Sequence, residues 1–471
     1  MWRHTSVGVV VLLIVAFGAV PAVAGATALG VAAVQTATAH TDLESAFIGT
    51  SLKQMSEPDD CGFLHCFTPQ MVQAGYNYGP AYAAVGGYLN AGAGQTIVIF
   101  DAFGSPTVAS DLATFDSTFG LPSATLNIIC PSGCPVLDLT GDSALSFNEI
   151  GWTQEIALDT QYAHAMAPAA AIDLVVAHSN SDNDILVAEL FALHHHLGNV
   201  WTQSFGSPEC TFTPGPTNPW FAENNKVYAK AVSEGVTIFA SAGDAGAQAG
   251  CLTPAANYPA SNPNNIAVGG TYLNESFGPA SPNGTYAYED TWNDFENPNL
   301  IAHSTVFGVG GGAPSRYFAT PWWQAGHTVT PFQCSGSPVV CVKKAPHFFL
   351  GKVAADVAYD AGVDGGVIGY WSAAPLVATP GFYIFGGTSA GSPQWAAIAA
   401  ILDQLSGGPL GNIAPELYFL GGTGSFHDIV HGSNTVYPPF ASPGLGYHAT
   451  PGFDAATGMG SPNVGVLINW I

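Results

Sequence analysis

The stretch FYIFGGTSAGSPQWAAIAAILDQL, residues 382–405, joins a strand pattern to a helix pattern through a pair of glycines. The aromatic and β-branched residues at its start predict a strand, whereas the alanine-rich run after Pro393 predicts a buried helix. Ser389 lies at the expected helix N-terminus, where unpaired N–H groups and the helix dipole favour negative charge. A serine in this position is either a helix cap or a nucleophile.

The same alternation of strand and helix patterns recurs along the chain. Runs rich in Val, Ile, Phe and Ala are separated by helical patterns at residues 152–167 and 218–235. Continuous apolar strands between helices are typical of a parallel sheet covered on both faces. We therefore expect an α/β fold with a mostly parallel central sheet, helices on both faces, and an active site at the carboxyl ends of the strands. The expected strands lie within residues 95–102, 171–179, 199–206, 235–244, 264–271 and 382–390.

The composition is acidic but poor in charge. The 471 residues include 33 Asp and Glu against 8 Lys and Arg, a formal net charge of -25, and charged residues make up only 9%. Nucleic acid is excluded as a partner because phosphate binding requires clustered basic side chains. Scarce bases limit self-repulsion once carboxylates are protonated, so we expect an acidic environment. A merely acidic secreted surface is the alternative; a halophile-like surface would raise total charge, which is not observed.

The N-terminus has the features of an export signal. Arg3, an apolar run from Val7 and small residues around Ala24 predict a signal peptide at residues 1–24. The uncharged stretch continues to about residue 34, so an uncleaved membrane anchor is the alternative. Residues 25–60 form a short N-terminal segment that is polar from residue 35 on, and a globular pattern occupies 61–471. No later segment is apolar for long enough to span a bilayer.

Eight cysteines fall into close neighbours along the chain. No pair has the C-x-x-C spacing of a zinc site. An even number in an exported chain favours disulfides. Proximity predicts the pairs Cys61–Cys66, Cys130–Cys134, Cys210–Cys251 and Cys334–Cys341.

A nucleophilic Ser389 requires a base, and histidine is a poor candidate here. Asp101 ends an early strand, as the aspartate of a subtilisin-type triad does, but no His-Gly-Thr helix start occurs in the chain. The three histidines 194–196 end a helical stretch, where the helix dipole favours them without any catalytic role.

Glu155 and Asp159 offer a carboxylate base instead. They are four residues apart, so both lie on one face of a helix that is otherwise apolar. Acids buried together share a proton, and a carboxylate still accepts protons in acid, where histidine is already charged. Two acids on a solvated helix face are the alternative interpretation.

Asp244 follows another predicted strand and lies between glycines in SAGDAG, residues 241–246. A protonated aspartate there could donate a hydrogen bond to an oxyanion, whereas an ionised one would repel it. An aspartate in a glycine-rich turn is also common for structural reasons.

Together these motifs resemble the sedolisin family of serine-carboxyl peptidases. The resemblance rests on GGTSAGSP at residues 386–393, EIALD at 155–159, AMAPAAAIDLVV at 165–176 and SAGDAG, with the acids and the serine in the order Glu, Asp, Asp, Ser. It extends from about Cys66 to the C-terminus. It implies a subtilisin-like fold in which a glutamate replaces the catalytic histidine.

The resemblance also implies roles for single residues. Ser389 is then the nucleophile, Glu155 the general base, Asp159 the residue that orients Glu155, and Asp244 the acid of the oxyanion hole. It further implies one structural Ca²⁺, bound near the C-terminus by HDIV and TPGFDAATGMGSP. The implied ligands are the carboxylates of Asp428 and Asp454 and the main-chain oxygens of Ile429, Thr450 and Gly452. Carboxylates and carbonyls are the hard oxygen ligands that Ca²⁺ takes, although the residues alone equally predict a simple turn.

Two features depart from the family pattern. The family usually carries a large folded propeptide, whereas residues 25 to about 65 are too few for one. The nucleophile motif has Gly386-Gly387 and Gly391 where Ser-Gly and Ser or Ala are commoner; neither change removes a catalytic group.

The sequence therefore predicts a secreted, acid-acting serine-carboxyl endopeptidase with a peptidase domain at residues 61–471. An exopeptidase that releases short peptides from N-termini is the alternative within the same class. A catalytically silent, membrane-tethered binding protein of the same fold is the alternative from another class. We expect protein or peptide substrates, no nucleic acid, membrane association only through an uncleaved leader, and a monomer.

Overall fold

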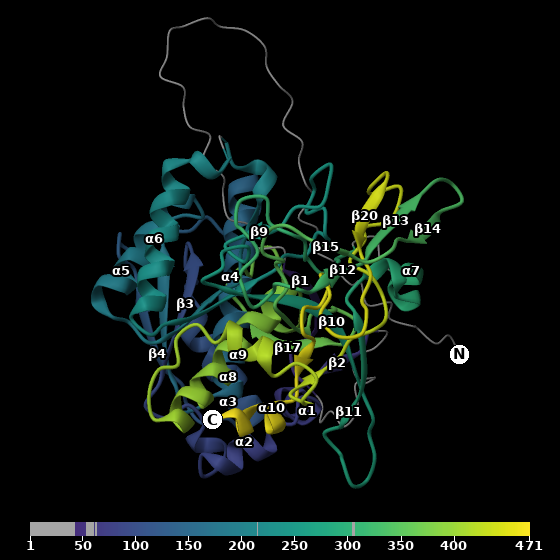
Figure 1. Ribbon diagram of the computed structural model, residues 1–471. Coiled ribbons are helices and arrows are strands. Elements are labelled where there is room, and N and C mark those ends of the chain that lie inside the picture. Colours follow the sequence, from purple (N-terminus) through teal and green to yellow (C-terminus); the bar gives the residue numbers. More distant parts are fainter. Residues whose placement is uncertain (1–42, 53–60, 62–63, 214, 304–306) are drawn as a thin grey trace, which may run out of the picture.

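The computed structural model describes residues 43–52, 61, 64–213, 215–303 and 307–471. Its centre is an eight-stranded sheet of order β11-β10-β8-β6-β3-β5-β4, with β16 paired to β10 (Figure 1). Every pairing in this sheet is parallel except that of β10 with β11, which confirms the predicted α/β class. The strands are β3 (Thr96–Ala102), β4 (Thr125–Ile129), β5 (Ala171–Ala177), β6 (Val200–Gln203), β8 (Thr237–Ser241), β10 (Ile266–Glu275), β11 (Tyr286–Thr291) and β16 (Val357–Asp360).

Helices cover both faces of this sheet because side chains alternate along its strands. On β3, Ile97 and Ile99 pack into one core with residues of α4 and α8, whereas Val98 and Phe100 pack into a second core with residues of α5 and α6. The helices that form these layers are α3 (Val108–Phe119), α4 (Ala144–Met166), α5 (Asp182–His195), α6 (Pro219–Ser233) and α8 (Gly391–Ser406).

A second sheet carries the strand that leads to Ser389. Its order is β1-β18-β17-β2, and β18 pairs antiparallel with both β1 and β17. The expectation that residues 382–390 belong to the parallel sheet is therefore wrong. Only residues 372–380 connect β17 to β18, and so short a connection suits an antiparallel pair rather than a crossover. The strands are β1 (Glu44–Gly49), β2 (Cys66–Phe67), β17 (Gly366–Trp371) and β18 (Gly381–Gly386).

Short elements fill the long connections. The helices are α1 (Pro69–Gly75), α2 (Gly79–Ala84), α7 (Pro298–His303), α9 (Ala414–Phe419) and α10 (Val464–Leu467). The strands are β7 (Ser207–Pro208), β9 (Asn257–Tyr258), β12 (Thr328–Val329), β13 (Pro331–Ser335), β14 (Val340–Lys343), β15 (His347–Phe348), β19 (Phe426–His427), β20 (Gly444–Tyr447) and β21 (Ser461–Pro462).

The four predicted disulfides are confirmed, and they join Cys61 to Cys66, Cys130 to Cys134, Cys210 to Cys251 and Cys334 to Cys341. Among the helices of the described ranges, none has the length and apolar character to cross a bilayer. The predicted signal peptide at residues 1–24 and the anchor alternative lie outside the described residues.

Candidate active site

Ser389 lies in the one-turn helix η6 (Thr388–Ala390), between the end of β18 and the start of α8. The N-cap residues of η6 and α8 are Gly387 and Ala390, so Ser389 caps neither helix. Only 3% of Ser389 is exposed, and its hydroxyl donates to the Ser204 carbonyl at 3.4 Å. A buried serine hydroxyl without a capping role is available for chemistry.

Gly387 shows why a glycine precedes this turn. Its φ of 108° lies in a region that only glycine adopts without strain. A Cβ atom at this position would also lie 2.5 Å from Oδ2 of Asp244. Glycine therefore allows the Asp244 carboxyl to approach the turn that carries Ser389.

Glu155 lies in the middle of α4, where every residue from Trp152 to Met166 is buried. The helix packs against α8, α3, β3 and β17, which explains why it is apolar on all sides. Burial raises the pKa of Glu155 well above its ordinary value, and the charges of Asp159 and Asp101 raise it further. The nearby Ser389 hydroxyl acts in the opposite direction. Apart from this effect of Ser389, the two oxygens of Glu155 accept no hydrogen bond from the described residues, so the protonated form is favoured.

Asp159 lies one turn further along α4 and is fully buried. The Ser204 hydroxyl donates to its Oδ1 at 2.8 Å. Burial raises the pKa of Asp159 well above its ordinary value, and the bond from Ser204 lowers it. Since the Ser204 carbonyl also accepts from Ser389, Ser204 connects the acid to the serine. The sequence analysis missed Ser204, which lies inside the predicted strand region 199–206 and directly follows the observed β6.

Asp101 adds a third carboxyl to this cluster. It is fully buried on β3, and its two oxygens meet no hydrogen-bond donor in the described part of the chain. Burial, and after it the charge of Asp159, raises the pKa of Asp101 well above its ordinary value. Three buried carboxyls this close cannot all ionise together, so the cluster retains protons.

Asp244 follows β8 and contacts the residue before Ser389. The Thr388 N–H and the Thr388 hydroxyl both donate to Asp244 Oδ1 at 2.8 Å. The N–H of Gly243 in turn donates to the Thr388 hydroxyl at 3.0 Å. These bonds fix the Asp244 carboxyl beside the turn of Ser389. The sequence analysis did not identify Thr388, whose adjacency to Ser389 was the only signal.

Three histidines of the described ranges have their partners outside this cluster. His196 is the C-cap of α5, and the ring of His195 stacks on Phe191, as expected for a helix terminus. His164 is buried on α4, where its Nε2 lies 2.8 Å from the Pro122 carbonyl. Within the described ranges, no hydrogen bond joins a histidine ring to Ser389.

Two of the expected calcium ligands, the carboxylates of Asp428 and Asp454, contact the loop of residues 450–454. The Gly452 N–H donates to both oxygens of Asp428 at 3.0 Å, and the Thr450 N–H donates to Asp454 Oδ2 at 3.1 Å. The main-chain oxygens of Ile429, Thr450 and Gly452 accept no hydrogen bond from the described residues. Two carboxylates and three such carbonyls fit the oxygen preference of Ca²⁺. The described residues contain no group of three or more Asp, Glu, His or Cys side chains able to hold a metal, so a cation here would depend on those carbonyls.

Comparisons with known proteins point in the same direction as this geometry. The chain is 30% identical over 375 residues to kumamolisin from Bacillus sp. (strain MN-32), covering 79% of this chain and 59% of that protein. It is 26% identical to sedolisin from Pseudomonas sp. (strain 101) over 394 residues, covering 80% and 58%. Human tripeptidyl-peptidase 1 is 28% identical over 330 residues, covering 67% and 51%. The chain thus spans little more than half the length of the curated relatives it matches, and no family model matches it.

A solved structure supports the fold. The structure of Pseudomonas sedolisin, a serine-carboxyl proteinase complexed with two molecules of pseudo-iodotyrostatin, matches with a TM-score of 0.66 at 23% identity. The match covers 87% of this chain and 98% of that one.

Proposed function

The chain is a member of the sedolisin family by homology to kumamolisin and sedolisin, and on this premise we propose that it is a serine-type peptidase. The observation that carries the proposal is the position of Ser389 beside a buried carboxyl, Glu155, with no histidine bonded to it in the described residues. Its substrates are then proteins or peptides, and the bond it cleaves is the peptide bond.

The first half of the reaction uses Ser389, Glu155 and Asp244. The Ser389 oxygen attacks the peptide carbonyl carbon while the Glu155 carboxylate takes the hydroxyl proton. The carbonyl π electrons move to oxygen, and a protonated Asp244 donates a hydrogen bond to the resulting oxyanion. Because Thr388 donates twice to Oδ1 of Asp244, the proton of this carboxyl belongs on Oδ2.

The second half regenerates the enzyme. The C–N bond breaks, the leaving amine takes the proton from Glu155, and the acyl group remains on Ser389. Water then attacks the acyl carbon while Glu155 accepts a proton from the water. Glu155 returns this proton to the Ser389 oxygen as the bond between that oxygen and the acyl carbon breaks, which releases the product acid and restores the hydroxyl. Asp159, fixed by Ser204, positions Glu155 and shares its charge.

Activity of this kind depends on two opposite protonation states. Glu155 accepts a proton only when ionised, and its pKa is raised by burial and by its carboxyl neighbours. Asp244 donates only when protonated. The rate should rise with pH as the Glu155 cluster ionises and fall as Asp244 ionises. The requirement for a protonated aspartate and the scarcity of basic residues, 8 in 471, support an acidic working environment.

The decisive experiment compares the wild type with Ser389→Ala and Glu155→Gln on an unfolded protein substrate across acidic and neutral pH. Each substitution should lower kcat by about 10⁴-fold or more, as expected for groups that act as a unit. Thr160→Ser, a change on the same helix outside the carboxyl cluster, serves as the control and should retain activity. Full activity of Ser389→Ala would refute the serine mechanism. Inactivity of the wild type at every pH would favour a silent binding protein.

The product pattern separates two kinds of peptidase. Endopeptidase action, our first choice, releases internal fragments from a protein blocked at its N-terminus. Exopeptidase action requires a free N-terminus and releases short peptides from it. One of the relatives is named a tripeptidyl-peptidase, which keeps this alternative open. Export is proposed from the N-terminal signal pattern and from the four disulfides.

We also propose that Asp428, Asp454 and the carbonyls of Ile429, Thr450 and Gly452 bind one structural Ca²⁺. When bound, the ion would neutralise two carboxylates and tie the loop of residues 450–454 to Asp428. Excess calcium should therefore stabilise the wild type by about 3 kcal/mol at a hundredfold excess over Kd, seen as a rise in Tm relative to chelated protein. Asp428→Asn should remove that difference. A wild-type Tm that is indifferent to calcium and chelator would exclude the site.

A further inference from the structure

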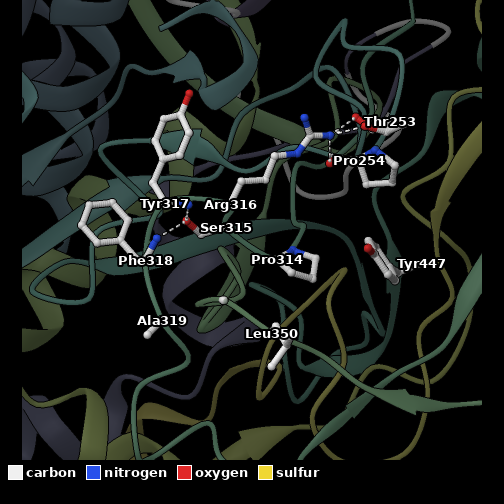
Figure 2. A pocket seen from close by; sticks show the side chains of 11 residues that line it. Thr253, Pro254, Pro314, Ser315, Arg316, Tyr317, Phe318, Ala319, Leu350 and Tyr447 are labelled. Carbon is white, nitrogen blue, oxygen red and sulfur yellow. Dashed lines mark hydrogen bonds between the residues drawn. The ribbon is translucent and has the colours of Figure 1, made fainter. Parts of the chain in front are cut away.

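A cavity of about 560 Å³ lies beside the loop that begins with Asp244 (Figure 2). Its walls come from residues 253–254, 314–319 and 350–351, with Tyr447 from β20. In Figure 2 the side chain of Arg316 extends toward Thr253 and Pro254, while Leu350 and Tyr447 lie below it in the view. The lining thus combines a single guanidinium with apolar and aromatic surface.

The Arg316 guanidinium is held in place without an acidic partner. Its Nη2 donates to the Thr253 hydroxyl and, at 3.0 Å, to the Pro254 carbonyl. No carboxylate in the described ranges forms an ion pair with it. The nearby Glu209 carboxyl is instead engaged by the Ser315 hydroxyl and by the Arg316 main-chain N–H at 2.7 Å. The positive charge of the guanidinium is therefore not cancelled by a direct contact.

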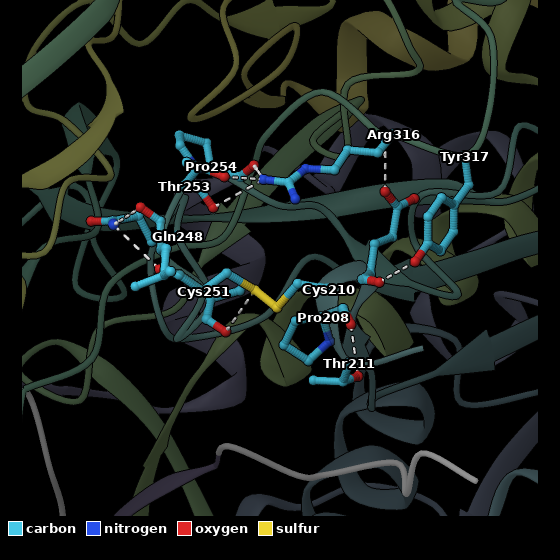
Figure 3. The surroundings of a disulfide bond; sticks show 12 residues. Pro208, Cys210, Thr211, Gln248, Cys251, Thr253, Pro254, Arg316 and Tyr317 are labelled. Atoms are coloured by element: carbon cyan, nitrogen blue, oxygen red, sulfur yellow. Dashed lines mark hydrogen bonds between the residues drawn. A yellow bond between two sulfur atoms is a disulfide. The ribbon is translucent and has the colours of Figure 1, made fainter. Parts of the chain in front are cut away.

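The cavity wall is cross-linked, so the loop whose Thr253 and Pro254 accept from the guanidinium is constrained before any ligand arrives. The disulfide between Cys210 and Cys251 joins the loop of Thr253 to the segment of Glu209 (Figure 3). The Tyr317 hydroxyl also donates to the Glu209 carbonyl of the same segment. A preorganised donor loses little conformational entropy when it binds an anion.

Two chain segments connect this cavity to the candidate active site. Ser204, whose carbonyl accepts from Ser389, is five residues before Glu209, and five extended residues span at most about 18 Å. The loop of Thr253 begins at Asp244, and the Asp244 carbonyl accepts from Val309 on the segment that leads to Arg316. A bound peptide of about six extended residues, roughly 20 Å long, could therefore reach from Ser389 to the cavity.

We propose that this cavity is a subsite for a carboxylate of the peptide substrate, with Arg316 as the cation that recognises it. The guanidinium donors that are not bonded to Thr253 and Pro254 face the carboxylate, since guanidinium and carboxylate groups pair through directed N–H···O bonds. Pro314 and Leu350, the latter 92% exposed, contact the aliphatic part that carries the carboxylate. The carboxylate comes either from an Asp or Glu side chain or from a peptide C-terminus. This assignment rests on the proposed peptidase function.

Binding to the Ser389→Ala protein tests the subsite without requiring turnover. The probes are alanine- and serine-based hexapeptides with Glu or Gln placed at each position in turn, each made as a free acid and as an amide. Calorimetry at about pH 5.5, where a free carboxyl is ionised, gives the Kd values. One Glu register should bind about fivefold more tightly than its Gln counterpart if a side chain is recognised. If the C-terminus is recognised, the free-acid peptide should instead bind more tightly than the corresponding amide.

Substitutions then assign the preference to Arg316. Arg316→Gln in the Ser389→Ala background should abolish the preference and leave the Kd of the neutral peptides unchanged. Lys226→Gln, which removes one exposed positive charge on α6, should retain it. Thr253→Val, which removes one acceptor of the guanidinium but no charge, should also retain the preference for the carboxylate. This control distinguishes the effect of a loosened loop from the effect of losing the positive charge.

Several outcomes would overturn the subsite. Equal binding of all acidic and neutral probes, no peptide binding at all, or a preference that survives Arg316→Gln would each do so. Failure of the peptidase proposal is a different result: the wild-type protein would then cleave no substrate, whatever the peptide-binding measurements give.

Discussion

Ser389, Glu155 and Asp244 come from three separate elements, and small neighbouring residues bring them together. Gly387 allows the Asp244 carboxyl to approach the serine turn, and Thr388 fixes it there with two hydrogen bonds. Ser204 donates to Asp159 and accepts from Ser389. The described residues provide no cation in this cluster. The carboxyls are therefore held by hydrogen bonds from hydroxyl and main-chain N–H groups.

Asp101 provides a test of this carboxyl cluster. Its charge contributes to the raised pKa of Glu155, so Asp101→Asn should lower that pKa and move the rising part of the profile of kcat/KM against pH to lower pH. Asp403→Asn, which changes another buried acid on α8, should leave the rising part in place. An unchanged rising part in Asp101→Asn would show that Asp101 does not interact electrostatically with Glu155.

Among the elements, α4 and the loop between β8 and β9 position most of the site. α4 is buried from Trp152 to Met166, so the carboxyls of Glu155 and Asp159 lie in a buried environment. The loop carries Asp244 at its start and Thr253 near its end, and the disulfide from Cys251 to Cys210 fixes it to the segment after β6. One loop therefore links the candidate oxyanion acid to the cavity of Arg316.

The disulfides Cys210–Cys251 and Cys130–Cys134 close loops of very different length, so their removal should lower the free energy of unfolding by different amounts. Cys210 and Cys251 are 41 residues apart, whereas Cys130 and Cys134 are four apart. Chain entropy predicts a loss of about 4 kcal/mol for the double Cys210→Ser, Cys251→Ser variant and of about 2 kcal/mol for the Cys130→Ser, Cys134→Ser control. Denaturant unfolding at fixed pH measures both free energies. A larger loss in the control would contradict the entropic explanation.

The whole molecule buries acidic groups that are more stable when protonated. Burial raises the pKa of Glu289 to about 7, despite hydrogen bonds from Ser461, Tyr76 and Thr271 that lower it. Burial likewise raises the pKa of Glu275 to about 9. Asp364 behaves oppositely: burial favours a higher pKa, but hydrogen bonds from His65 and two asparagines lower the value to about 2. These shifts predict that the fold is most stable at mildly acidic pH.

The free energy of unfolding should therefore decrease on both sides of mildly acidic pH. A raised glutamate pKa stabilises the fold fully below its ordinary value of 4.5, and that contribution is lost as pH rises through 7 and 9. The stabilising contribution of the Asp364 carboxylate is present above pH 3.8 and is lost as the pH falls toward 2. Glu289 alone should account for about 3 kcal/mol between pH 4.5 and neutral pH.

Denaturant unfolding as a function of pH measures this dependence. Glu289→Gln, which cannot ionise, should flatten the decline between pH 4.5 and about 7. Stability that rises from pH 4.5 to 9 would show that these carboxyls are not buried as the structure describes.

Local patterns determined several strands and helices and the cysteine pairs of this protein. The runs at residues 95–102 and 235–244 form β3 and β8, and each cysteine pairs with its near neighbour. Such features follow from the sequence because side-chain periodicity and short loops act over a few residues. The spacing of four between Glu155 and Asp159 likewise placed both acids on one helix.

Tertiary structure alone decided which elements meet. Residues 382–385 are a strand, as predicted, but pair with β17 and β1 in a second sheet, since hydrogen bonding between strands is non-local. Asp101 becomes part of the carboxyl cluster only because β3 packs against α4. Ser204, Thr388 and Arg316 gain their partners across 45 to 185 residues of sequence. No local pattern encodes such contacts, because they depend on how both faces of the central sheet are packed.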